Sequence, residues 1–463
     1  MMKDTKTRQE YISFYNHTGI ERHLTNMARQ GWLLEKISLR GWTYRRSEPR
    51  ELHYCVSYYA QASEFDPEPS EGQRTFHDFC AHTGWKLVCT WHQMQIFRNE
   101  QADPVPIETD PVTEVASIHR ACKKNYLLGQ WIWLILSVLV CGIQLPRLWV
   151  DPIGILSSAT MSFGTTCYLL MLVLSSTELA VYYLWYHKAK KAARQGIFSD
   201  TPDTGKFQRV MMSVVLISAA IWIFNLIPNG DGMLRGVTLV TFITTLCCIL
   251  ITQLATRRMK QAKVSKRINI GIAVAICLVF SVAMNTVLPA IVINSRNSAE
   301  KVYEHEGITY HLPQEEIPLE VKDLTEPATE LYIKERSASQ TLLLGRLTVR
   351  QYSALGLEDS AGMPGLEYTV TTVNVPFLYD WCQAQIFKIQ DDGNNRIPEG
   401  HRRIYQETDA APWGANAAYR LYHEEGRWLN TYLLCYEERI VEIHFDFEPT
   451  EEQMAVVAEK LNP

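Results

Sequence analysis

One acidic side chain, Glu178, stands in the apolar segment LSSTELAVYY, where a charge is costly. A carboxylate inside a membrane is by default a candidate for proton or ion transfer. Alternatively, the membrane-spanning part ends near Ser176, and Glu178 lies at the membrane surface beside Lys188, Lys190 or Lys191. No other apolar segment carries a matching cation, and relays usually contain several polar groups. The surface position is therefore favoured.

The two cysteines of the C-terminal block, Cys382 and Cys435, offer a second kind of chemistry. They could close a long loop as a disulfide, which stabilises a fold mainly by restricting the unfolded chain. They could equally remain two buried thiols, and the sequence leaves both alternatives open. The serines Ser337, Ser339 and Ser353 have no nucleophile motif around them, so no hydrolase is expected.

Two patterns resemble metal sites without completing one. His444 and Asp446 share one face of an expected strand with Glu442 and Glu448, but alternating polar residues are typical of a solvated face. The segment 391–395 resembles part of a calcium loop but lacks the closing glutamate, so we interpret it as a turn between strands. We expect no metal, no cofactor and no enzymatic activity.

Five long apolar segments dominate the middle of the chain. They run over Tyr126–Leu145, Ile153–His187, Val210–Ile227, Met233–Leu254 and Ile268–Ile293. A bilayer core about 30 Å thick needs roughly 20 apolar helical residues. Helices are expected because lipid cannot bond to free backbone groups. The second segment, as one helix, would extend about 52 Å and must tilt or protrude. A buried core of a soluble protein is the alternative, and five such segments are hard to bury.

Basic residues alternate between the loops, and this alternation predicts the orientation. The basic stretches are Arg120, Lys123 and Lys124 before the first segment; Lys188, Lys190, Lys191, Arg194, Lys206 and Arg209 in the second loop; and Arg257, Arg258, Lys260, Lys263, Lys266 and Arg267 in the fourth. The first and third loops have only Arg147 and Arg235, offset by Asp151 and Asp231. Positive loops stay in the cytoplasm. We therefore expect a cell-membrane protein with its N-terminus inside and its C-terminal domain outside.

These patterns divide the chain into four parts. They are an α+β domain at 1–100, a polar linker at 101–125, five membrane spans at 126–293 and an extracytoplasmic α+β domain at 294–463. The net charges of 1–125, 126–294 and 295–463 are 0, +9 and −14. The acidic last block argues against nucleic acid as a partner. The polar start MMKDTKTRQE does not look like a signal peptide, so the first domain is expected inside the cell.

The first domain contains an internal repeat. Ala28 to Trp32 (ARQGW) recurs 53 residues later as Ala81 to Trp85 (AHTGW). Each unit predicts a helix, a glycine that ends it and a strand pair, with a further strand expected at Tyr11–Tyr15. Trp32 and Trp85 are expected to be structural, packed between sheet and helices. The pattern predicts a two-layer α+β domain.

The same region resembles a known family. It contains MARQGWLLEKI, then the motifs Trp42-Thr-Tyr44-Arg45 and PRELHY, and later Gly84-Trp85 and Ile96-Phe97-Arg98. Over about 100 residues it is similar to the DUF 2812 family, a domain of unknown function. The resemblance implies a bacterial protein of the Firmicutes type, with membrane spans after the domain and a link to a PadR-type transcription regulator. It implies no catalytic residues.

The C-terminal block is expected to be mostly antiparallel sheet. Strands are predicted at Tyr368–Val375, Leu429–Tyr436 and Arg439–Phe447, followed by a helix over Glu451–Leu461 that Thr450 caps.

Together these features favour a non-catalytic membrane protein in a sensing, regulatory or scaffolding role. Its partners would be the lipid bilayer and an unidentified protein. The alternative is a transporter or an accessory subunit of one, for which Glu178 would be the functional carboxylate.

Overall fold

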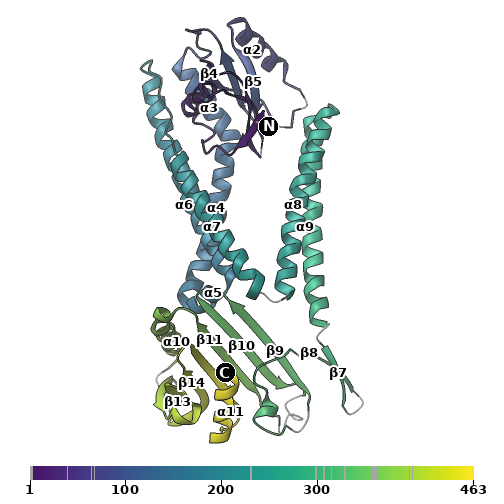
Figure 1. Cartoon of the computed structure of the whole chain (residues 1–463), viewed down its shortest axis with the longest axis vertical. Helices are drawn as coiled ribbons and strands as arrows, with labels where there is room; N and C mark the ends of the chain where they lie inside the picture. Colours follow the sequence, from purple (N-terminus) through teal and green to yellow (C-terminus); the bar gives the residue numbers. More distant parts are fainter. Residues whose placement is uncertain are drawn as a thin grey trace. The chain divides into compact units, whose positions relative to one another are not determined.

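A computed structural model describes residues 4–38, 40–63, 65–66, 68–229, 232–297, 300–305, 308–313, 315–327, 330–355, 363–395, 397–398 and 400–462. Asp231, counted above in the third loop, lies outside these residues. The chain forms two compact units (Figure 1). The first comprises 1–141, 166–218 and 245–281, and the second 142–165, 219–244 and 282–463.

The N-terminal domain of the first unit consists of two βαββ repeats. The first repeat is β1 (Thr5–Arg8), α1 (His17–Arg29), β2 (Trp32–Ser38) and β3 (Gly41–Arg46). The second is β4 (His53–Tyr58), α2 (Glu71–His82), β5 (Lys86–Trp91) and β6 (Met94–Asn99). The sheets have the equivalent orders β1-β3-β2 and β4-β6-β5. Both helices are followed by a left-handed glycine, Gly31 at φ +78° and Gly84 at φ +86°. The N-terminal α+β fold is thus as predicted.

The expected strand at Tyr11–Tyr15 is wrong, because β1 lies earlier, at Thr5–Arg8, and pairs with β3. Residues 14 and 15 form a turn instead. Asn16 then caps α1 by accepting a hydrogen bond from the backbone N–H of Gly19. The aromatic alternation that looked like a strand serves a different purpose, since Tyr15 is fully buried in the core of this unit.

Trp85 and Trp32 have different surroundings, although they are equivalent in the repeat. Trp85 is 4% exposed, packs with Cys80 and Phe97, and donates its ring N–H to the carbonyl of Val105 at 2.8 Å. Trp32 is only half-buried. Its ring lies between two cations, with Lys6 Nζ at 3.8 Å and the Arg46 guanidinium at 5.1 Å from the ring centroid. Trp85 is a core residue, whereas Trp32 makes cation–π contacts at the surface.

After the linker, α3 (Pro111–Lys124) precedes five long apolar helices. These are α4 (Tyr126–Val150), α6 (Ala159–Ala193), α7 (Gly205–Asn229), α8 (Gly232–Gln261) and α9 (Lys266–Asn297). All five contain a stretch long and apolar enough to cross a membrane, which confirms the five predicted segments. Leu216, Phe242 and Val279 are among many large apolar side chains exposed on α7, α8 and α9. Such a surface is suited to lipid.

The second unit contains a hairpin and a seven-stranded antiparallel sheet. The hairpin strands are β7 (Glu300–His305) and β8 (Ile308–Pro313). The strands of the large sheet are β9 (Tyr332–Gln340), β10 (Leu344–Ser353), β11 (Leu366–Val373), β12 (Arg403–Thr408), β13 (Ala417–His423), β14 (Arg427–Cys435) and β15 (Arg439–Phe445). Their order is β12-β13-β14-β15-β11-β10-β9. This confirms the predicted antiparallel character of the block.

Alternating side chains give this sheet two apolar faces. Tyr432 and Leu434 point to the face that packs with α11 (Glu451–Leu461), which Thr450 caps as expected. Leu433 and Cys435 point to the other face, which packs with α10 (Tyr379–Asn394). The short helix α5 (Pro152–Ser157) covers the same face through Ile153. The central strands β14 and β15 therefore contribute to apolar clusters on both faces of the sheet, whereas the edge strand β12 is mostly exposed.

The interpretation of 391–395 as a turn between strands is wrong. Asp391 to Asn394 form the last turn of α10. Asn394 fixes this end, because its amide donates to the carbonyl of Arg403 and accepts from the N–H of the same residue. The Asp-Asp-Gly composition favours a turn locally, but the contact with β12 extends the helix.

The unequal burial of the two tryptophans gives a test. Trp85→Ala should destabilise the N-terminal domain by about 3–5 kcal/mol, because it leaves a cavity in the core. Trp32→Ala should cost only about 1–2 kcal/mol, since it removes partial burial and the cation–π contacts. Thermal unfolding of the full-length protein in detergent would measure both. Equal losses would show that Trp32 is also a core residue.

Candidate functional site: the attachment of the N-terminal domain to the membrane helices

Glu178 of α6 is 2% exposed and accepts three hydrogen bonds. Its Oε2 accepts from the hydroxyls of Ser13 at 2.9 Å and Tyr126 at 2.6 Å. Its Oε1 accepts from the side-chain amide of Gln208 at 2.9 Å. Ser13 belongs to the N-terminal domain, Tyr126 begins α4 and Gln208 lies in α7. One buried carboxylate therefore connects three helices to the segment before α1.

This environment differs from the expected pairing of Glu178 with Lys188, Lys190 or Lys191. The donors are neutral hydroxyl and amide groups, each supplied by a different element. Hydrogen bonds to an ionised acceptor are the strong ones, so three of them can hold a charge that has lost its water. The position of Glu178 at the membrane surface, rather than inside the bilayer core, stays a prediction. No pattern in the sequence indicated Ser13, which is 165 positions away.

Aromatic rings surround this carboxylate on the side of the N-terminal domain. Tyr15 packs edge-on against Tyr182 at 5.0 Å and lies 5.5 Å from Trp185, both of α6. It also lies 5.6 Å from Tyr126. Burial, together with the nearby charge of Glu178, raises the pKa of Tyr15 well above its ordinary value. The domain and the end of α6 thus share one continuous apolar core.

Two loops between the membrane helices also contact this domain. In the loop before α7, the hydroxyl of Thr201 lies 2.7 Å from that of Thr18 in α1. In the loop between α8 and α9, Lys263 pairs with Glu68 at 2.6 Å. Lys266, the first residue of α9, pairs with Asp66 at 3.2 Å. Both loops are among the basic ones of the sequence. They are expected on the same side of the membrane as the N-terminal domain.

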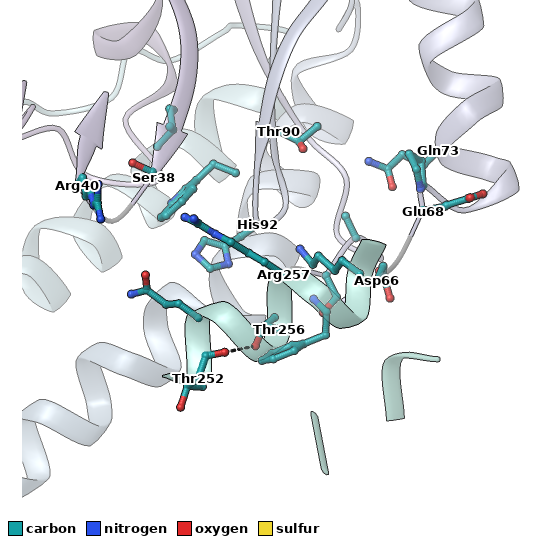
Figure 2. A pocket seen from close by; sticks show the side chains of 18 residues that line it. Ser38, Arg40, Asp66, Glu68, Gln73, Thr90, His92, Thr252, Thr256 and Arg257 are labelled. Atoms are coloured by element: carbon teal, nitrogen blue, oxygen red, sulfur yellow. Dashed lines mark hydrogen bonds between the residues drawn. The ribbon is translucent and has the colours of Figure 1, made fainter. Parts of the chain in front are cut away.

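A pocket of about 580 Å³ lies where the domain meets α8 (Figure 2). Its walls are the β2–β3 turn, the β5–β6 turn, the last turns of α8 and the residues Ala62, Ser63, Phe65, Asp66, Glu68 and Pro69. The two turns occupy equivalent positions in the two repeats. Figure 2 shows Arg257 of α8 reaching across the pocket toward His92, which has a left-handed backbone at φ +54°. No motif in the sequence indicated this pocket, because its residues are distant in the chain.

In the second unit, the loop between α4 and α6 attaches to the C-terminal domain. Ile153 of α5 is 3% exposed and packs with Leu344 and Val373 of the sheet. Asp151 caps α5 and accepts from the Arg346 guanidinium at 2.8 Å and 2.9 Å. The hydroxyl of Thr341 donates to the carbonyl of Leu156. From the sequence, Asp151 was considered only as a negative charge that offsets Arg147 in the first loop, and its contact with Arg346 was not predicted.

Cys382 and Cys435 lie in one apolar cluster between α10 and the sheet, as free buried thiols. The Gln383 side chain donates to Sγ of Cys435 at 3.4 Å. Burial raises the pKa of Cys382 to about 11 and also raises that of Cys435, which makes both thiols poor nucleophiles. The disulfide alternative stays a prediction.

Among the described residues, one group has the spacing of metal ligands: His401, His423 and Glu425. Two imidazoles and a carboxylate suit zinc. Here the group is satisfied internally, because His401 Nδ1 lies 2.7 Å from Glu425 Oε1 and His423 Nδ1 accepts from a backbone N–H. Nε2 of His444 lies 3.7 Å from Oδ1 of Asp446. His444 also hydrogen-bonds to Thr431, and Asp446 accepts from the N–H of Gly365.

Five apolar helices between two folded α+β domains are the architecture of a multi-pass membrane protein. Residues 16–129 match the family model described as protein of unknown function, DUF2812, which confirms the resemblance of the N-terminal region. The match extends over α3 and the first residues of α4, so it includes Tyr126. No curated protein and no solved structure matches this chain.

The hydrogen bonds of Glu178 predict that it is structurally important. Glu178→Gln replaces one acceptor oxygen with a donor and removes the charge. It should cost about 1–3 kcal/mol, because at least one buried donor loses its partner. That corresponds to a thermal midpoint lower by roughly 2–10 °C for the full-length protein in detergent. The control is Glu35→Gln on the exposed side of β2, which should change stability by less than about 0.5 kcal/mol. An unchanged midpoint in Glu178→Gln would contradict the buried site.

Proposed function

We propose that this chain is a non-catalytic regulatory membrane protein that couples a C-terminal domain on one side of the membrane to the DUF2812 domain on the other. The observation that carries the proposal is which loops contact which domain. The loop between α4 and α6 contacts the C-terminal domain through Ile153 and Asp151. The next loop, between α6 and α7, contacts the N-terminal domain through Thr201.

Consecutive loops of membrane-spanning helices lie on opposite sides of the bilayer. If α6 crosses it, the two loops at its ends are separated by the membrane, and so are the domains they contact. The loop between α8 and α9, two crossings after Thr201, again contacts the N-terminal domain through Lys263. This alternation agrees with the positive loops of the sequence, which support an N-terminal domain inside and a C-terminal domain outside.

The position of helix α6 supports a role in signalling. Its first residues follow α5 directly, and its last turns, with Tyr182, Trp185 and Ala189, are part of the N-terminal core. A displacement of α5 by an event on the C-terminal domain would act on one end of a continuous helix. Such an element can couple two sites only if both ends are held, and here both are.

The transporter alternative receives less support. A transport carboxylate should face other polar groups along a path through the membrane. Glu178 is instead enclosed by Ser13, Tyr126 and Gln208. Gln208 also donates to Ser13 at 2.7 Å, which joins α7 to the segment before α1. In the proposed function Glu178 holds the N-terminal domain in place. The PadR-type regulator implied by the family resemblance is a partner that this domain would bind in the cytoplasm.

Cysteine accessibility tests the sidedness. Asp200→Cys lies in the loop before α7, and Glu452→Cys at the start of α11, both at exposed positions. In intact cells, a membrane-impermeant maleimide should label Glu452→Cys well above the unsubstituted protein. Asp200→Cys should be labelled only after the membrane is permeabilised. Labelling of both positions in intact cells would contradict the proposal, as would the reverse pattern.

A further inference from the structure

The pocket between the N-terminal domain and α8 carries an excess of positive charge. It is lined by Arg40 of the β2–β3 turn and by Arg257 and Lys260 of α8. Over the described part of the chain, no ion pair joins any of these three to a carboxylate. The acidic residues that line it within the described part of the chain are paired: Asp66 with Lys266 at 3.2 Å, and Glu68 with Lys263 at 2.6 Å and Arg74 at 2.5 Å. The described charged groups of the pocket therefore favour an anion.

The other lining groups fit an anion with several oxygen atoms. His92, Ser38 and Thr90 contribute ring nitrogens and hydroxyls from both hairpin turns. Asp66 and Glu68 hold Lys266 and Lys263, so the acidic groups do not compete for the arginines. Guanidinium groups bind phosphate in a forked geometry, and neighbouring ammonium groups add charge. The volume of about 580 Å³ is that of a small-molecule site and exceeds what a single small ion needs.

We infer that this pocket binds a phosphate-bearing anion. Two sources share this chemistry: the headgroup of an anionic phospholipid and a soluble phosphorylated molecule. A headgroup is reachable because α8 is an apolar helix whose residues Leu250, Ile251 and Leu254 are exposed just before the pocket. Acyl chains could lie along this surface while the phosphate enters between Arg257 and Lys260. Binding of such an anion does not depend on the direction of signalling between the two domains.

Occupation of the pocket would connect α8 to the N-terminal domain. Arg257 and Lys260 come from the helix, whereas Arg40 and His92 come from the two hairpin turns. A bound phosphate would neutralise cations from both sides, which otherwise repel one another. The ligand should therefore strengthen the attachment of the domain to this helix.

The experiment uses the purified full-length protein in detergent micelles and two probes. Native mass spectrometry would count bound phosphatidylglycerol against phosphatidylcholine, and calorimetry would measure inorganic pyrophosphate. The variants are Arg257→Gln with Lys260→Gln, and separately Arg40→Gln on the other wall. Arg258→Gln is the matched control, because Arg258 is an exposed neighbour on the same helix that does not line the pocket. The thermal midpoint of each variant without ligand reports its folding.

We expect at least one probe to bind, about fivefold more weakly for each pocket cation removed and roughly 25-fold more weakly for the double variant. Arg258→Gln should bind as the unsubstituted protein does. Selective binding of phosphatidylglycerol would identify a lipid headgroup, and binding of pyrophosphate a soluble anion. Equal binding by Arg40→Gln, the double variant and Arg258→Gln would overturn the inference. Binding of neither probe above phosphatidylcholine would overturn it as well.

Discussion

The constraint on which this structure depends is that one uninterrupted helix, α6, is held at both ends by folded protein. Only Ser158 separates it from α5, which is packed on the C-terminal sheet, and it ends inside the core of the N-terminal domain. Neither attachment consists of exposed contacts alone. Ile153 is buried at one end, and Tyr182 and Ala189 are buried at the other. Residues next to the start of the helix and in its last turns are therefore part of packed cores, and cores do not deform gradually.

The two attachments differ in their physical character. At α5, the Asp151–Arg346 pair is partly exposed, and pairs of this kind contribute only about 0–1 kcal/mol. Burial of the Ile153 side chain is worth about 1.5–3 kcal/mol, so the apolar contact is the stronger part of that attachment. At the other end a buried carboxylate takes part. Glu178 costs free energy unless all its donors are present, which makes that end specific for one arrangement of Ser13, Tyr126 and Gln208.

Local patterns in the sequence predicted the elements but not these attachments. The five apolar helices follow from segment length, and the two N-terminal helices with their glycine ends follow from the ARQGW and AHTGW repeat. The strands β14 and β15 and the capped helix α11 follow from alternation and from Thr450. Two local errors, at Tyr11–Tyr15 and at 391–395, arose where contacts with distant residues decided the conformation.

The candidate sites could be predicted only in part, for the same reason. Glu178 was identifiable because an acidic residue in an apolar helix is unusual. Its donors were not, since they lie 165, 52 and 30 positions away. The residues of the pocket form no motif in the sequence, because Arg40, His92 and Arg257 come from three elements that only the fold brings together. Asp151 and Arg346, 195 positions apart, are a further example.

The most direct test of coupling through α6 is hydrogen exchange in the full-length protein reconstituted in nanodiscs. Ile153→Ser would weaken the attachment of α5, and Ile404→Ser, at an exposed position of β12, is the control. We expect faster amide exchange in Ile153→Ser at residues 10–20 and 196–205, where the N-terminal domain meets the end of α6 and the following loop. The control should leave both segments unchanged. Faster exchange confined to α5 and the C-terminal sheet would contradict coupling through this helix.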